Sequence, residues 1–564
     1  MSKRQLPLVL TSPPPAVRRK GGSSLPSPSA GLEYVVHPRT VSSFFATTFE
    51  QECTFIKASV EDARKGAGLF TLETLLALLD ADVGLAFGVH LNAYEFVDGA
   101  KHMRNPTGEG DDEGPVLATR AVVESLLAAG VSLQFHQPQQ HSSSLHALLA
   151  GMEAQLGCLV GANIYITPAG AQGLAPHHDD IEAFVLQLEG AKDWCVYKPV
   201  EPEKALPASY SDDIGAHRLE GRTPLRLSLA PADVLYFPRG WIHYAKAPCS
   251  SSSSSSSSAA AASYTHSTHV TISTYQRWTW GDFLGASVPR ALAAIAARED
   301  TPLLRRGLPR RFVGLDTRPH HANSSSSSSS DGVAATTAVA AAATAAAAAA
   351  KHTLKEMLCA PGMIDALVEE LWSGGSVQRF AMDFCTSRLP PSNAVRVAAE
   401  SIEAIGPRSA VVSCDPTLLC VVETDARDVG EGGDETLTIF HCLANTRETH
   451  MMGGGGGGGE EEEGYSDESG EDEEGEEVEV GAEEEEEEEE EESGGQGDKA
   501  VVFPRTLRPL LEKLLDAYPN PISVGTLANV RLSDGTRAGF ENAVGASREL
   551  ARAGIIASAS DVAQ

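Results

Sequence analysis

Between about residues 32 and 283 the sequence holds many short strand patterns, and they constrain the fold more than any other feature of the chain. They are rich in β-branched and aromatic residues and are separated by Gly and Pro. Examples are GLAFGVHLNAYEFV from Gly84, GANIYITPAG from Gly161, AFVLQLEGAKDWCVY from Ala183, DVLYFPRGWIHYAKA from Asp233 and HVTISTYQRWTW from His269. Many short strands at close spacing predict a β-barrel or a β-sandwich.

After this β-rich region the pattern becomes helical. Apolar residues recur at helical spacing in DFLGASVPRALAAIAARE at 282–299 and in PGMIDALVEELW at 361–372. The C-terminal part then combines two strand-like runs, SAVVSC and TLTIFHC, with two helical runs, LRPLLEKLLDAY and RAGFENAVGASRELARAGII. Helices and strands mixed over so short a length suit a winged-helix-like module.

Three low-complexity segments lack the large apolar side chains that a packed core needs. They are a Ser/Ala insertion at 250–262, a Ser- and Ala-rich linker at 318–351 and a Gly-rich, acidic insertion at 451–499. The last contains 24 Asp and Glu between residues 460 and 498, and without them the formal net charge of −33 would be −9. The acidity is therefore a local feature and not a property of the whole surface.

The cysteines, the apolar runs and a short basic run indicate which cellular compartment suits the chain. Nine cysteines are scattered without a CxxC pair, which suits a reducing compartment better than a disulfide framework or a zinc module. The apolar run at 6–10 is too short for the core of a signal peptide, and no apolar stretch of about 18 residues predicts a membrane span. The basic run at 18–20 fits part of a nuclear signal or a solvated tail.

The stretch PHHDD contains two overlapping His-x-Asp pairs, His177 with Asp179 and His178 with Asp180. On a strand, residues i and i+2 lie on the same side, so either pair aims an imidazole and a carboxylate at one point. One more His from a distant strand would complete a 2-His-1-carboxylate triad, the ligand set of non-haem Fe(II) oxygenases. Both frames satisfy the spacing, so the pattern alone leaves the choice open, and a solvated turn is the alternative.

Candidates for the second histidine are His243, His266 and His269. His243 fits best, because it follows DVLYFPRG, a strand and turn that would return the chain to the same end of the barrel. Lys192 lies about one strand and one turn beyond Asp179 and suits the distal carboxylate of an acidic co-substrate. The alternative for Lys192 is a hairpin-turn lysine in water.

Four segments closely resemble the ribosomal-oxygenase branch of the JmjC proteins, whose members include bifunctional lysine-specific demethylases and histidyl-hydroxylases. They are NIYITPAGAQGLAPHHDDIEAFVLQLEGAKDWCVYKP, DVLYFPRGWIHYAKA, STYQRWTWGDFL and RRGLPRRF. The resemblance begins at about Leu32 and implies an α+β fold. Its parts are a JmjC double-stranded β-helix (a cupin-like barrel) at 32–284, a helical dimerisation region at 285–391 and a winged-helix-like domain at 392–564. The Pro-rich, polar segment at 1–31 before them is expected to be a disordered tail.

The resemblance also implies a ligand set. In the family the first metal ligand directly follows a Pro, which makes His177, Asp179 and His243 the ligands of Fe(2+). His178 then becomes a variable spacer that points away from the metal, and Asp180 becomes a structural residue.

The same resemblance implies a site for 2-oxoglutarate. Lys192 matches the residue that binds its far carboxylate, and Tyr165 matches the hydrogen-bonding partner of that carboxylate. Asn163 and Ser273 match positions lining the same pocket. His269 is either a further pocket residue or a core histidine whose ring is hydrogen-bonded.

With O2 as the second co-substrate, the implied activity is hydroxylation of a histidyl residue in a large-subunit ribosomal protein. The same chemistry on an N-methyl group would demethylate histone H3 at lysines 4 and 36. A catalytically inactive scaffold is the alternative, and the intact triad argues against it. The implied partners are a ribosomal protein or histone H3 and a second copy of the chain, in the nucleus and its nucleolus. Few basic residues lie in the C-terminal part, so direct nucleic-acid binding is not expected.

Overall fold

The computed structural model describes residues 25–60, 64–107, 115–199, 206–249, 265–306, 355, 362–373, 376–392, 398–423, 435–447, 450 and 499–559. It divides the chain into two compact units: the described residues of one lie between 277 and 382, and the other comprises the described residues before and after them. The Ser/Ala insertion at 250–262 and the linker at 318–351 lie outside the described residues, as does the acidic insertion apart from Lys499.

The described residues begin at 25, before the predicted end of the N-terminal tail at residue 31. A 3-10 turn, η1 (Pro28–Ala30), precedes helix α1 (Leu32–Val36). This segment packs closely on helix α5 (Ser143–Leu156), where a Cβ on Gly151 would come within 2.7 Å of the Ser29 carbonyl oxygen. Leu25 also packs against the main core. None of the side chains of η1 is buried, so the close backbone approach to α5 and the partly buried Leu25 are the contacts that hold this segment.

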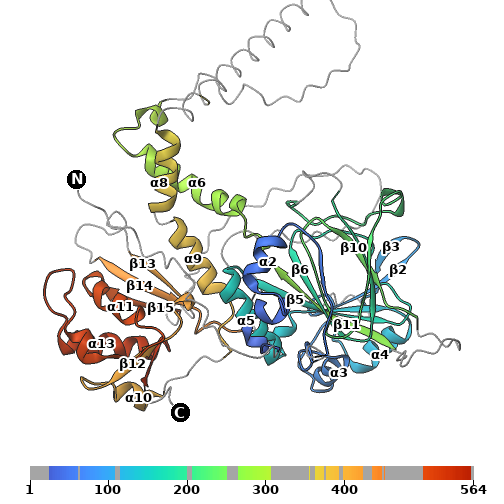
Figure 1. The fold of residues 1–564 in the computed structure, drawn as a ribbon, viewed down its shortest axis with the longest axis horizontal. Helices are drawn as coiled ribbons and strands as arrows, with labels where there is room; N and C mark the ends of the chain where they lie inside the picture. The colour runs from blue at the N-terminus through green and yellow to red at the C-terminus, as the bar shows by residue number, and fades with distance from the viewer. Residues whose placement is uncertain are drawn as a thin grey trace, which may run out of the picture. The chain divides into compact units, whose positions relative to one another are not determined.

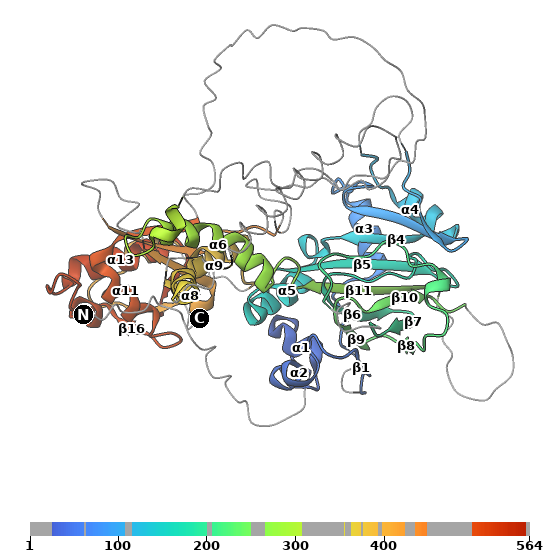
Figure 2. The same ribbon diagram turned by 90° about the horizontal axis from the view of Figure 1, so that it is seen from above.

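Two antiparallel sheets form the predicted barrel, and Figure 2 shows their strands stacked across the molecule. The larger sheet has the order β1-β9-β6-β11-β5-β4-β2-β3, and the smaller has the order β10-β7-β8. The strands are β1 (Thr54–Ile56), β2 (Leu91–Val97), β3 (Ala100–Met103), β4 (Ser132–His136), β5 (Val160–Pro168), β6 (Glu182–Glu189), β7 (Lys192–Tyr197), β8 (Leu225–Leu229), β9 (Val234–Phe237), β10 (Ile242–Lys246) and β11 (His266–Thr274).

The central strand β6 of the large sheet is buried on both faces over most of its length, which explains its nearly continuous apolar run. Ala183 and Val185 face a core shared with the small sheet. Phe184 and Leu186 belong to a second core on the opposite face, which also contains residues of the helices. These are α1, α2 (Val41–Thr47), α3 (Leu72–Asp80), α4 (Arg120–Ala128) and α5, several of which Figure 1 labels beside the sheet.

In the C-terminal part, the described residues form two small sheets and four α-helices around a common core. One sheet has the order β13-β14-β15 and the other β16-β12-β17. The elements are α10 (Ala399–Glu403), β12 (Ala410–Ser413), β13 (Leu419–Glu423), β14 (Thr436–His441), β15 (Ala500–Pro504), α11 (Arg508–Leu515), β16 (Ile522–Ser523), α12 (Val524–Ala528), α13 (Gly539–Arg552) and β17 (Ile556–Ser558). The label winged-helix-like stays a prediction.

The unit between 277 and 382 is helical, as its sequence predicts. It contains α6 (Trp280–Ala296), α8 (Met363–Ser373) and the first part of α9 (Ser376–Ser387). Phe380 stacks on Trp278 with ring centroids 4.2 Å apart. The unit ends before the predicted boundary at 391, because Cys385 and Arg388 already bond to backbone carbonyls of the C-terminal part. Among the described residues, no helix combines the length and apolar character that crossing a membrane requires.

Candidate metal centre and co-substrate pocket

Backbone pairing brings the PHHDD segment beside the start of β10. The N–H of His177 donates to the carbonyl of His243 (3.2 Å), and the N–H of His243 donates to the carbonyl of His177 (2.8 Å). The N–H of Gly240 donates to the carbonyl of Asp179 (2.9 Å). Gly240 has φ +81°, which favours glycine at this turn between β9 and β10. Two segments far apart in the sequence are thereby held in register.

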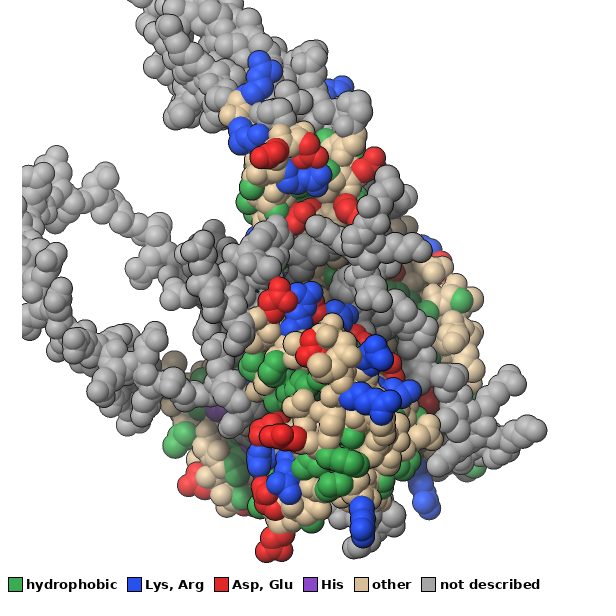
Figure 3. Space-filling view, turned by 90° about the vertical axis from the view of Figure 1, so that its left-hand side faces the viewer, with side chains coloured by type: hydrophobic (Ala, Val, Ile, Leu, Met, Phe, Trp, Pro, Cys, Tyr) green, Lys and Arg blue, Asp and Glu red, His purple; other side chains and the backbone are tan. Residues whose placement is uncertain are grey.

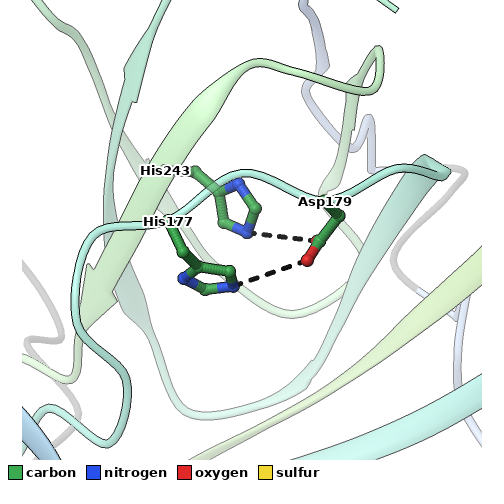
Figure 4. Close-up of side chains that lie close together, drawn as sticks. All are labelled: His177, Asp179 and His243. Atoms are coloured by element: carbon green, nitrogen blue, oxygen red, sulfur yellow. Dashed lines mark ion pairs between the residues drawn. The ribbon is translucent and has the colours of Figure 1, made fainter. Parts of the chain in front are cut away.

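The side chains of His177, Asp179 and His243 converge on one point, as Figure 4 shows. One potential ligand atom from each lies within 4.8 Å of the other two. The Nε2 atoms of His177 and His243 lie 3.6 and 3.5 Å from the two carboxylate oxygens of Asp179. These separations exceed ordinary hydrogen bonds, so the three groups face a common space that suits a metal cation.

The two histidines are held in the tautomer that a metal requires. The Nδ1–H of His177 donates to the carbonyl of Ala175 (2.8 Å), and that of His243 donates to the carbonyl of Trp241 (3.1 Å). Each Nε2 therefore keeps its lone pair and turns it toward Asp179. Burial, reinforced by His177, lowers the pKa of His243 to about 4, so this ligand is neutral at pH 7.

A pocket adjoins the triad, and Lys192 lies in its wall. Its side chain is only 5% exposed, and its Nζ donates to the hydroxyl of Thr167 (2.8 Å). Burial lowers the pKa of Lys192 to about 7. Within the described part of the chain no carboxylate pairs with it, so the pocket presents a buried amine without a counter-ion. A ligand carboxylate would supply that counter-ion.

Aromatic rings form another part of the pocket wall. Tyr165 stacks on His269 with ring centroids 5.0 Å apart and an interplanar angle of 7°. Trp194 meets the same imidazole edge-on, with centroids 5.4 Å apart. His269 is buried, and its Nδ1 has no hydrogen-bond partner among the described residues. His269 is therefore a pocket residue and not a core histidine with a satisfied ring.

The other candidate residues lie outside the pocket lining. Asn163 accepts a hydrogen bond from His136, and Ser273 pairs along the backbone with Gly161 and Ala183, so a role for either in co-substrate binding stays a prediction. His266 lies 3.3 Å from Glu189 and away from the triad.

His178 and Asp180 do not join the ligand cluster or the pocket lining. The backbone N–H of His178 donates to the hydroxyl of Ser211 (2.9 Å). The geometry therefore selects the first of the two His-x-Asp frames.

Several residues that line the pocket are not among the site residues predicted from the sequence. Thr167, Thr271 and Trp194 each follow a predicted site residue by two positions, so strand alternation from Tyr165, His269 and Lys192 would have found them. Two more, on other strands, carry no local signal: Tyr94 and Ser132.

Comparison with known proteins finds a known domain family in this region of the chain. The JmjC domain family matches residues 134–276, which include the triad and Lys192. Ribosomal oxygenase 1 of Rattus norvegicus is 39% identical over 282 residues, covering 50% of this chain and 42% of the relative. Ribosomal oxygenase 2 of the same species is 33% identical over 442 residues, covering 76% of this chain and 80% of the relative.

Two further proteins resemble this chain over a smaller share of its length or with a low TM-score. The bifunctional lysine-specific demethylase and histidyl-hydroxylase NO66 of Dictyostelium discoideum is 34% identical over 282 residues, covering 50% of this chain and 49% of the relative. YcfD, a ribosomal oxygenase from Escherichia coli in complex with cobalt and 2-oxoglutarate, aligns with 93% of this chain and 99% of its own at 11% identity and a TM-score of 0.36, too low to bear on function. The match to the ribosomal oxygenase 1 relatives spans less than half of their length.

JmjC oxygenases use Fe(II) and 2-oxoglutarate, and the residues present fit both. Two imidazoles and one carboxylate are the donor set of non-haem Fe(II) sites, and the Lys192 amine, which has no counter-ion among the described residues, suits a dicarboxylate. The likeness to ribosomal oxygenase 2 extends along most of both chains and includes this site. The chain therefore belongs to the ribosomal oxygenase family of JmjC proteins.

Proposed function

We propose that the chain is an Fe(II)- and 2-oxoglutarate-dependent protein oxygenase that hydroxylates a histidyl residue of a ribosomal protein. The observation that carries the oxygenase activity is the convergence of His177, Asp179 and His243 beside a pocket with a buried lysine that has no counter-ion among the described residues. The choice of a ribosomal target is supported by the names of the relatives, ribosomal oxygenase 1 and ribosomal oxygenase 2.

Bound iron and 2-oxoglutarate would supply the oxidising power that inserts one oxygen atom of O2 into a C–H bond, with succinate and CO2 as co-products. The chain's own residues would bind these two groups and exclude water. The triad would hold the metal through two lone pairs whose direction is set by backbone carbonyls. Lys192 would bind the far carboxylate, and the apolar walls around Trp194 and Phe237 would exclude water.

Demethylation of histone H3 at lysines 4 and 36 is a second candidate, supported by the name of the Dictyostelium relative. Oxidation of an N-methyl carbon gives an unstable hemiaminal that loses formaldehyde, whereas oxidation of a ring-bearing side-chain carbon gives a stable alcohol. The same site therefore serves either reaction, depending on which C–H bond lies nearest the metal. An inactive scaffold has less support, because it would not require a buried amine beside an intact triad.

The first test measures conversion of 2-oxoglutarate to succinate by the wild-type chain and two variants. His177→Ala should abolish turnover, whereas His178→Ala, the adjacent histidine outside the cluster, should retain it. Equal loss in both variants would point to misfolding, and retention in both would exclude the triad. Mass spectrometry of peptide substrates then separates the reactions, because hydroxylation adds one oxygen atom and demethylation removes one methylene. Absence of the oxygen adduct on every histidyl peptide would exclude histidyl hydroxylation.

A second copy of the chain is the proposed partner of the helical unit. Ile364, Val368 and Trp372 lie on one side of α8, at i, i+4 and i+8, and are 62%, 56% and 49% exposed. Such an apolar stripe suits burial against another helix. Ile364→Glu should shift the chain from dimer to monomer in analytical ultracentrifugation, whereas Val502→Glu, at an equally exposed apolar position on β15, should not.

Direct nucleic-acid binding by the C-terminal part is not proposed. Figure 3 shows basic and acidic side chains interspersed over the face it draws. Ion pairs with glutamates engage Arg505, Arg508, Arg548 and Arg552, so these guanidinium groups are not available as a basic stripe for phosphates. A nuclear and nucleolar location follows from the proposed ribosomal target, and imaging of the tagged chain would test it.

A further inference from the structure

A buried ion pair links the two chain segments that carry the metal ligands. It joins Glu182, the first residue of β6, to Arg239, in the turn between β9 and β10. The Glu182 side chain is 0% exposed and the Arg239 side chain 5%. Glu182 follows the ligand Asp179 by three residues. Arg239 precedes the ligand His243 by four residues. Neither side chain of the pair belongs to the ligand cluster or to the pocket lining.

The Glu182 carboxylate extends the pairing of two barrel strands by one step. The backbone ladder between β6 and β9 ends at the pair formed by Ala183 and Phe237. The next residue after β9 is Pro238, which has no N–H with which to continue the ladder. Instead, Oε1 of Glu182 accepts the backbone N–H of Arg239 at 3.3 Å and its Nε–H at 3.0 Å. One carboxylate therefore holds both the backbone and the side chain of the turn residue.

Two more residues fix the orientation of this pair. The hydroxyl of Tyr236 donates to Oε2 of Glu182 and accepts the backbone N–H of Glu50 at 2.9 Å. The Nη2 of Arg239 lies 3.4 Å from the carboxylate of Glu50. Glu50 has φ +56°, a conformation that favours glycine, so the backbone is strained at the residue that closes the network. Connected buried hydrogen bonds hold one geometry more firmly than a single contact does.

We propose that Glu182 and Arg239 are positioning residues that set the separation between the metal ligands Asp179 and His243. This inference rests on the metal centre of the proposed function and adds what holds its two halves at a fixed distance. The backbone bond from Gly240 to Asp179 sets the register, but a turn at glycine leaves the backbone free to pivot. The planar guanidinium of Arg239 donates in fixed directions and limits this pivot. Because ligand atoms must lie within about 0.2 Å of the preferred metal distance, even a small pivot weakens binding.

Two single variants break the pair in different ways. Glu182→Gln keeps the shape of the side chain and removes its negative charge. Arg239→Met removes the guanidinium and leaves the carboxylate of Glu182 buried without it. Each variant should raise the Kd of Mn(II) by about ten- to hundredfold, as the loss of residues that orient metal ligands does. Arg239→Met should also lower the stability toward urea more than Glu182→Gln does, because it leaves an uncompensated buried charge.

The double variant Glu182→Gln/Arg239→Met separates positioning from stability. It removes both charges, so it should be more stable toward urea than Arg239→Met alone. If the pair positions the ligands, the affinity for Mn(II) should nevertheless stay as low as in the single variants, because the link between the two segments is still broken. Should Arg239→Met fail to fold, the isosteric Glu182→Gln and the double variant still give the comparison.

Glu153→Gln is the matched control for loss of a buried carboxylate. Glu153 is 0% exposed on α5, accepts two backbone N–H groups and lies 2.8 Å from the imidazole of His450. It lies outside the segments 177–182 and 239–243 that hold the ligands and the proposed link. This variant should lose stability toward urea and keep the wild-type Kd for Mn(II).

Calorimetry measures the Kd of Mn(II) for the full chain and each variant, and urea unfolding of the metal-free protein followed by circular dichroism measures stability. An Mn(II) affinity that recovers with stability in the double variant, or that falls equally in Glu153→Gln, would overturn the inference, because stability alone would then explain it. Wild-type affinity in both single variants would remove the positioning role and leave the proposed function intact. If the wild-type chain itself binds no Mn(II), the proposed function fails together with the inference.

Discussion

Raising the pH above 7 should weaken the binding of 2-oxoglutarate, because Lys192 loses its charge. Burial lowers the pKa of this amine from 10.5 to about 7 in the free pocket, where Thr167 is its hydrogen-bond acceptor and neutral His269 lies nearby. A bound carboxylate would favour the ammonium form and raise the pKa again. Binding then takes up a proton, so affinity is full below pH 7 and declines as the pH rises toward the pKa of the complex.

The magnitude follows from the pKa of the free pocket. With a pKa of about 7, the charged fraction of Lys192 falls from about three quarters at pH 6.5 to about one thirtieth at pH 8.5. If only the ammonium form binds, the Kd should rise about 25-fold over this range, which is about 2 kcal/mol. An ordinary exposed lysine would stay charged at both pH values and give no change.

Calorimetry with Mn(II) in place of iron would measure both the Kd and the proton uptake. Titrations at pH 6.5 and 8.5, each in two buffers of different ionisation enthalpy, give the number of protons bound per 2-oxoglutarate. Lys192→Arg is the matched variant, because a guanidinium remains charged at every pH in this range and should remove the dependence. A wild-type Kd that is equal at both pH values, with no proton uptake, would refute the reasoning.

Three further predictions concern stability and the insertions. Lys192→Met should stabilise the metal-free protein against urea by about 5 kcal/mol below pH 7. The gain should fade toward pH 10.5, where the unfolded lysine also loses its proton, and a pH-independent gain would contradict this. Arg239→Met breaks a 3.0 Å buried ion pair with Glu182 and should cost about 3–5 kcal/mol in urea unfolding, whereas Arg120→Met on the surface should change little. Deletion of residues 250–258, which lie outside the described part of the chain, should leave succinate release intact, because loop-closure entropy depends only weakly on loop length. Loss of metal binding in this deletion variant would instead show that the loop is part of the site.

The barrel prediction is confirmed, because its evidence is local. Alternating apolar residues and the Gly and Pro between them reflect the backbone geometry of each strand, and β5, β6, β7 and β10 lie where these patterns predict them. The boundaries between the parts of the chain depend less on local sequence patterns. A described 3-10 turn already lies before residue 31, and the helical unit ends before residue 391. In each case a short segment packs against a distant element that the local pattern does not include.

The sequence by itself determined which chemical groups are available: two overlapping His-x-Asp pairs, a later histidine at His243 and a lysine one turn after a strand. Only the tertiary structure decided which of them meet. Residues at i and i+2 share a side in either frame, so the choice of His177 over His178 depends on the backbone pairing with β10. The depth of Lys192 in the pocket wall likewise arises from tertiary packing, which no local stretch of sequence encodes.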